Sequence, residues 1–89
     1  MSFGSKLSPK LRKALVKSSG DTIVHSLVEL VPGTDIEALI RALTSLGAEV
    51  RTRSEQAHTM TIDIPVSRLP ELNGLAGIMY VEADEQYRY

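Results

Sequence analysis

Residues 22–47 read TIVHSLVELVPGTDIEALIRALTSLG and contain the clearest secondary-structure signals of the chain. Its first part, Thr22–Leu30, is rich in branched apolar side chains, which is typical of a β-strand. A Pro-Gly pair then predicts a turn. Apolar side chains recur at helical spacing after the turn, and Thr34-x-x-Glu37 has the pattern of a capping box at a helix start. We therefore expect a strand, a turn and an amphipathic helix that stops at Gly47.

Two stretches with alternating polar and apolar residues follow this helix. In residues 48–55, Ala48, Val50 and Thr52 alternate with charged side chains. In residues 58–64, Met60, Ile62 and Ile64 alternate with Thr59, Thr61 and Asp63. Such alternation is typical of strands that are buried on one face, so we expect these two to form a hairpin. Strict alternation would turn both Arg51 and Arg53 away from the core.

A second helix is predicted to follow the hairpin. Ser67 has the character of a helix N-cap, and an Asn-Gly pair predicts that the helix ends at Gly74. A proline falls in the first turn of this helix, where a missing N–H costs little. Leu69, Leu72 and Leu75 would then face the core.

A last strand and a short helix near the N-terminus complete the predicted elements. Residues 77–83 read as the last strand. Near the N-terminus, Ser8 followed by Pro9 is a helix-start signal, and the helix would run to Ser18. This helix is short and basic with a narrow apolar stripe, so we expect it to be peripheral.

The elements after the N-terminal helix follow the order β-α-β-β-α-β. Right-handed crossovers place the strands antiparallel in the order four, one, three, two, with the two main helices on one face of the sheet. We therefore expect an α+β fold, a ferredoxin-like sandwich with a four-stranded antiparallel sheet. The chain would divide into an N-terminal segment (1–21), this domain (22–84) and a flexible C-terminal tail (85–89).

Composition excludes several classes of function. The chain has 89 residues with ten basic and eleven acidic side chains, and this balance argues against nucleic-acid binding. There is no Cys, so a disulfide or thiolate metal site is excluded, and no apolar run reaches the roughly 20 residues of a membrane span. His25 and His58 have no partners at ligand spacing, and no Gly-rich phosphate loop is present. We expect no metal, no cofactor and no enzymatic activity.

The predicted fold leaves one face of the sheet without helices, and we call it the open face. It would be mostly polar with some apolar content. Two interpretations are left open by the pattern alone, a solvated surface and a docking surface for a partner. The side chains expected on the open face are His25, Leu27, Glu29, Glu49, Arg51, Arg53, Thr59, Thr61, Asp63, Tyr80 and Glu82.

The end of the chain carries a family resemblance. Residues 80–89 read YVEADEQYRY, in which Val-Glu-x-Asp closes the last strand and a short tail follows. This resembles the prodomain of subtilisin-like serine proteases. Residues 22–35 resemble the family's first strand and turn, and residues 47–86 resemble its hairpin, second helix and last strand. The chain is thus similar to the subtilisin propeptide-like protease inhibitors from residue 22 to residue 89.

This resemblance implies an inhibitor of a subtilisin-like serine protease that also serves as an intramolecular chaperone. Its open face, with Leu27, Glu29 and Tyr80, would pack on two surface helices of the enzyme. Glu82 and Asp84 would cap the N-termini of those helices, where a carboxylate is favoured by about 0.3–1 kcal/mol. The tail would lie in the substrate cleft as a product-like peptide, with its last side chain in the primary specificity pocket. The cleft-binding residues would be Gln86, Tyr87, Arg88 and Tyr89.

Two alternatives stay open at this point. The N-terminal ten residues have no signal-peptide pattern. A freestanding inhibitor would then be cytoplasmic, whereas a prodomain excised from a longer protease precursor would be secreted. In either case we expect a monomer when the protein is free. The alternative function is a ferredoxin-like ligand-binding or regulatory module that dimerises through its sheet.

Overall fold

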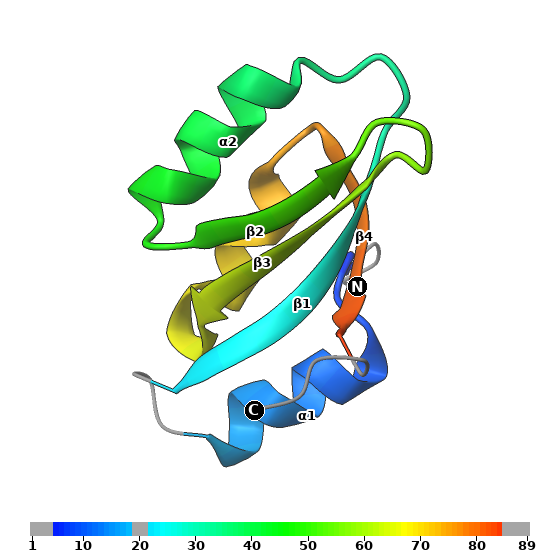
Figure 1. Ribbon diagram of the computed structural model, residues 1–89. Coiled ribbons are helices and arrows are strands. Elements are labelled where there is room, and N and C mark those ends of the chain that lie inside the picture. Colours follow the sequence, from blue (N-terminus) through cyan, green and yellow to red (C-terminus); the bar gives the residue numbers. More distant parts are fainter. Residues whose placement is uncertain (1–4, 19–21, 85–89) are drawn as a thin grey trace.

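A computed structural model of the chain describes residues 5–18 and 22–84 (Figure 1). The predicted cleft-binding residues, Gln86 to Tyr89, lie outside the described residues. The elements are α1 (Pro9–Lys17), β1 (Ile23–Leu30), α2 (Ile36–Ser45), β2 (Glu49–Ser54), β3 (Thr59–Pro65), the 3₁₀-helix η1 (Val66–Gly74) and β4 (Ile78–Ala83).

The four strands form one antiparallel sheet in the order β2-β3-β1-β4. In Figure 1 the sheet is seen from its uncovered side, with η1 behind it, α2 beside the edge formed by β2, and α1 at one end. The α+β prediction is therefore confirmed, including the strand order and the single covered face. The sheet has an open face, as the sequence indicated.

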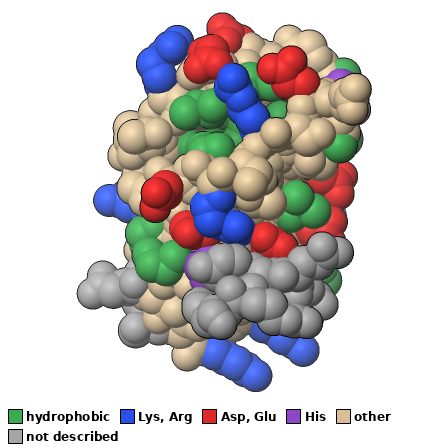
Figure 2. All heavy atoms as spheres, in the orientation of Figure 1, with side chains coloured by type: hydrophobic (Ala, Val, Ile, Leu, Met, Phe, Trp, Pro, Cys, Tyr) green, Lys and Arg blue, Asp and Glu red, His purple; other side chains and the backbone are tan. Residues whose placement is uncertain are grey.

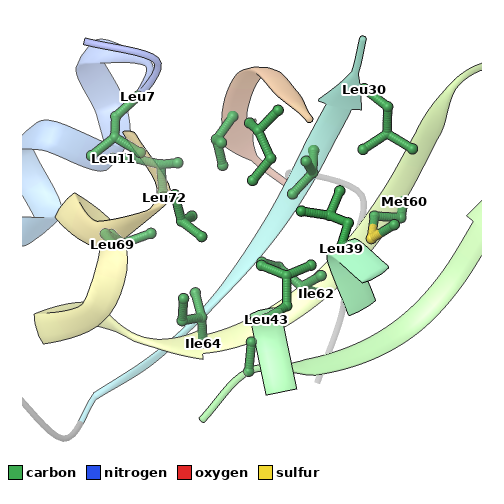
Figure 3. Packing of buried hydrophobic residues seen from close by; sticks show 14 of the residues in the cluster. Leu7, Leu11, Leu30, Leu39, Leu43, Met60, Ile62, Ile64, Leu69 and Leu72 are labelled. Carbon is green, nitrogen blue, oxygen red and sulfur yellow. The ribbon is translucent and has the colours of Figure 1, made fainter. Parts of the chain in front are cut away.

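The hydrophobic core lies between the sheet and its helices (Figure 3). On β1, Ser26, Val28 and Leu30 are buried, which is the alternation expected for a strand covered on one side. Leu39 and Leu43 of α2 pack against this face. Fully burying a side chain of this size contributes roughly 1.5–3 kcal/mol, so the core holds the sheet against the helices.

The start of α2 differs from the predicted capping box. Asp35 is the N-cap, and its side chain accepts a hydrogen bond from the backbone N–H of Ala38 at 3.2 Å. The Thr34 hydroxyl instead donates to backbone carbonyls of the preceding turn and of the loop before β4. Glu37 pairs with Arg53 of β2 at 2.8 Å. The predicted cap was wrong by one residue, because the Thr34 hydroxyl is used by the turn.

The second predicted helix is a 3₁₀-helix. It runs over Val66–Gly74, and no side chain caps its start, so the predicted Ser67 cap was wrong. Val66, Leu69 and Leu72 are buried and recur every third residue, which is the repeat that places side chains on one face of a 3₁₀-helix. Pro70 lies inside the element and has no N–H for an α-helical hydrogen bond.

A β-bulge interrupts β2. Val50 pairs with Ile62 on β3, but Thr52 already pairs with Thr61, so β2 contains one extra residue, Arg51. A bulge of this kind reverses the alternation of the residues that follow it. The predicted strict alternation of β2 therefore holds only up to the bulge.

The bulge corrects one residue of the predicted open face. Arg53 points to the helix side of the sheet, where its guanidinium pairs with Glu37 of α2. Thr52 takes its place on the open face, and its hydroxyl lies 2.7 Å from that of Thr61. Arg51 remains on the open face as predicted. The two arginine side chains therefore lie on opposite faces of the sheet.

The N-terminal segment is packed more firmly than expected. The Ser8 side chain accepts from the Leu11 N–H, which confirms the predicted N-cap. Backbone bonds join Lys6 and Ser8 to Val81, each at 2.8 Å, and form a short parallel bridge on the outer edge of β4. Leu7 and Leu11 are buried in the core. The helix itself is peripheral as expected, since Leu11 is its one buried residue, but the segment before it also contributes Leu7 to the core.

Candidate functional site: the open face of the sheet

Register sorts the open face into three rows that cross the sheet, each with one residue from every strand or its end. The charged row is Glu49, Asp63, His25 and Asp84; the middle row is Thr52, Thr61, Leu27 and Glu82; the far row is Ser54, Thr59, Glu29 and Tyr80. Figure 2 shows this face, on which acidic and basic side chains lie beside hydrophobic ones. The rows give each candidate residue a defined set of neighbours.

The charged row is joined by Arg51. Its Nε donates to Asp63 Oδ1 at 2.7 Å, and its Nη2 donates to Asp84 Oδ2 at 2.8 Å. His25 Nδ1 lies 2.6 Å from the same Asp63 oxygen. These four side chains, of Arg51, Asp63, Asp84 and His25, are only 13 to 24% exposed. Together they form a partly buried network that crosses the sheet from one edge to the other.

The protonation states follow from this geometry. Burial of the Asp63 carboxyl acts to raise its pKa, but hydrogen bonds from His25 and Arg51 outweigh it, and the pKa lies below its ordinary value. The hydrogen bond to Asp84 raises the pKa of Arg51. An ionised carboxylate can only accept hydrogen bonds, so Nδ1 of His25 carries the proton that faces Asp63.

The middle and far rows hold the predicted docking residues. Leu27 lies between Thr61 and Glu82, and Glu29 pairs with Tyr80. All five side chains are half-buried. The structure therefore brings Leu27, Glu29 and Tyr80 together on the open face, while their role in docking stays a prediction.

The two predicted capping acids also lie on the open face. Glu82 ends the middle row and Asp84 ends the charged row, so their carboxyl groups project from the same side of the sheet. Both residues are half-buried, and Asp84 is engaged by Arg51. Strand alternation predicted Arg51 and Asp63 on the open face. It did not predict that Arg51 pairs with Asp63 and Asp84, because it gave no sign of the bulge.

Among residues 5–18 and 22–84, no group of three or more His, Cys, Asp or Glu side chains could hold a metal ion. Within those ranges, no helix has both the length and the apolar character needed to cross a membrane. His25 and His58 lie toward opposite ends of β1, because the Leu30 N–H donates to the His58 carbonyl.

A shallow hollow of about 450 Å³ lies away from the open face. It sits between α2 and the loops that follow β1 and precede β4, and its walls are mostly apolar. The lining residues are Val31, Pro32, Gly33, Thr34, Asp35, Ala38, Leu39, Ala42, Leu75, Ala76 and Gly77. A ligand in this hollow would not touch the three rows.

No protein-family model matches the chain, and no curated protein matches it.

Proposed function

We propose that this protein inhibits a subtilisin-like serine protease by docking its open face on the enzyme and placing residues 86–89 in the substrate cleft. By the same contacts it would help that enzyme to fold. The observation that carries the proposal is the position of Asp84. This residue belongs to the charged row, so the last described residue lies at the border of the surface that would dock.

The open face offers two kinds of contact to such a partner. Leu27 and Tyr80 supply apolar surface in the middle and far rows, and burial of a large apolar side chain contributes roughly 1.5–3 kcal/mol. Glu82 supplies a carboxylate, and a helix N-terminus favours a carboxylate by about 0.3–1 kcal/mol, or up to ~2 kcal/mol when partly buried. This combination suits a partner that presents helix ends beside apolar side chains.

The residues after Asp84 are long enough to reach a cleft. Five extended residues span roughly 17 Å. An extended peptide can pair with a strand of its partner through backbone hydrogen bonds, while alternate side chains enter pockets. Tyr89 and Tyr87 alternate in this way, and Tyr89 is the side chain we assign to the primary specificity pocket.

A titration tests the proposal. The protein is added to several purified subtilisins, and residual activity is measured, together with the dissociation rate of each complex. We expect inhibition by the full chain, and dissociation at least about tenfold faster when Tyr87–Tyr89 are removed, because lost contacts act mainly on dissociation. The Arg53→Gln variant is the matched control, since Arg53 lies on the helix side. Equal inhibition by the shortened chain, or none by the full chain, would refute the proposal.

A further inference from the structure

Asp84 is held at two points in the free protein. Its backbone N–H donates to the carbonyl of His25 at 2.9 Å, which is a bond to β1. Its side chain accepts from Arg51 Nη2 at 2.8 Å, which is a bond to the bulge of β2. Since β2 and β4 are the two edge strands, the second bond ties the end of one edge to the other across the open face.

An arginine at the bulge is well suited to this connection. Its guanidinium is a planar fork, and here two different nitrogens reach carboxylates on two different elements, Asp63 of β3 and Asp84 after β4. A lysine carries a single ammonium group and would not reproduce both directions. The bulge is what brings Arg51 into the charged row, because its neighbours Val50 and Thr52 keep their own pairs on β3.

Charge strengthens the connection. The charged row contains three carboxylates, those of Glu49, Asp63 and Asp84, and Arg51 is the cation that bridges two of them. Removing the guanidinium would take away the cation that bridges the Asp63 and Asp84 carboxylates on a partly buried surface, where repulsion between like charges is stronger than in water. This repulsion would favour movement of the Asp84 side chain away from the sheet.

We infer that Arg51 is a positioning residue for the C-terminal peptide: it fixes Asp84 on the open face and so sets where residues 85–89 start. The consequence for inhibition rests on the proposed function. The ion pair between Arg51 and Asp84, which we call the clamp, is a property of the free protein. Asp84 then contributes through Arg51 by placing the peptide, which differs from the helix-capping role that the family resemblance implied. A pre-placed peptide loses less conformational freedom on binding and binds more tightly.

The clamp is tested first without any protease. Backbone amide hydrogen exchange at Asp84 is compared in the wild type, Arg51→Gln, Arg51→Lys and Arg53→Gln, with melting temperature as the check on folding. We expect exchange about tenfold faster in Arg51→Gln, an intermediate value in Arg51→Lys and no change in Arg53→Gln. If Arg51→Gln does not fold, Asp84→Asn removes the other partner and gives the same readout. Unchanged exchange in both Arg51 variants would refute the clamp.

The positioning role is then tested by dissociation from a subtilisin. Arg51→Gln and Asp84→Asn should each dissociate about tenfold faster, and the double variant no faster than either, because both changes break one connection. If exchange changes but dissociation does not, the positioning role is refuted while the proposed function stands. If the wild type inhibits no subtilisin, the proposed function and the positioning role both fail, and the exchange data alone decide the clamp.

Discussion

Replacing Asp63 by Asn should weaken the fold in a pH-dependent way. Asp63 is the centre of the charged row, where its carboxylate accepts from His25 at 2.6 Å and from Arg51 at 2.7 Å. A hydrogen bond to a charged group contributes roughly 1.5–3 kcal/mol, and an exposed ion pair about 0–1 kcal/mol. Because the Asp63 side chain is 20% exposed, we expect Asp63→Asn to lower the free energy of unfolding by about 1–3 kcal/mol at neutral pH.

The sign of the pH dependence follows from the pKa of Asp63. Burial alone would raise it, but the bonds from His25 and Arg51 hold it below its ordinary value of 3.8. The folded protein therefore binds fewer protons than the unfolded chain at pH values just under 3.8. The stability that Asp63 contributes is complete above that pH and is lost as pH falls through the lower, folded-state pKa.

Urea denaturation of the wild type and Asp63→Asn at a series of pH values measures this effect. The difference in unfolding free energy should be constant near neutral pH and shrink towards zero in strong acid. Glu49→Gln is the matched control, because Glu49 lies opposite Asp63 in the same row but is exposed. A difference that persists unchanged in acid, or an equal loss in Glu49→Gln, would show that the ionised Asp63 carboxylate does not stabilise the fold in this way.

Three further substitutions test the core, one loop and the open face. Ser26 is fully buried and its hydroxyl has no hydrogen-bond partner among the described residues, so thermal unfolding of Ser26→Ala should show a gain of up to about 1 kcal/mol. A Cβ on Gly77 would lie 2.6 Å from Thr34 Cγ2; Gly77→Ala should therefore cost about 1–3 kcal/mol in the same assay, and adding Thr34→Ser should recover part of it. Leu27→Asp should keep the wild-type circular dichroism spectrum yet raise the inhibition constant at least about tenfold, since it would bury a charge against the protease. Unaltered inhibition would exclude the middle row from the interface.

The fold could be predicted from the sequence wherever one periodicity ran without interruption. Strand β1 and helix α2 have clear repeats of two and of about 3.6 residues, and right-handed connection rules then left one strand order. Element η1 was predicted as a helix of the wrong kind. Its buried residues Val66, Leu69 and Leu72 recur at intervals of three, a spacing shared by α- and 3₁₀-helices.

The candidate site was predicted in part. The positions of Leu27, Glu29 and Tyr80 on the open face followed from alternation alone. Separating Arg51 from Arg53 required the register between β2 and β3, because one inserted residue reverses every later side chain. A bulge has no sequence signal of its own here, since neither arginine is a glycine or another turn residue.

The central claim is that the open face and the residues after Asp84 bind one subtilisin together. Backbone NMR spectra of the labelled protein, recorded as a subtilisin is added, test it most directly. We expect signals of the middle and far rows and of residues 85–89 to change together. Covalently blocking the protease cleft should abolish the change in residues 85–89. Changes confined to α2 and the hollow beside it, or row signals that shift with protein concentration without protease, would rule out this joint binding and favour a ligand-binding or dimeric module.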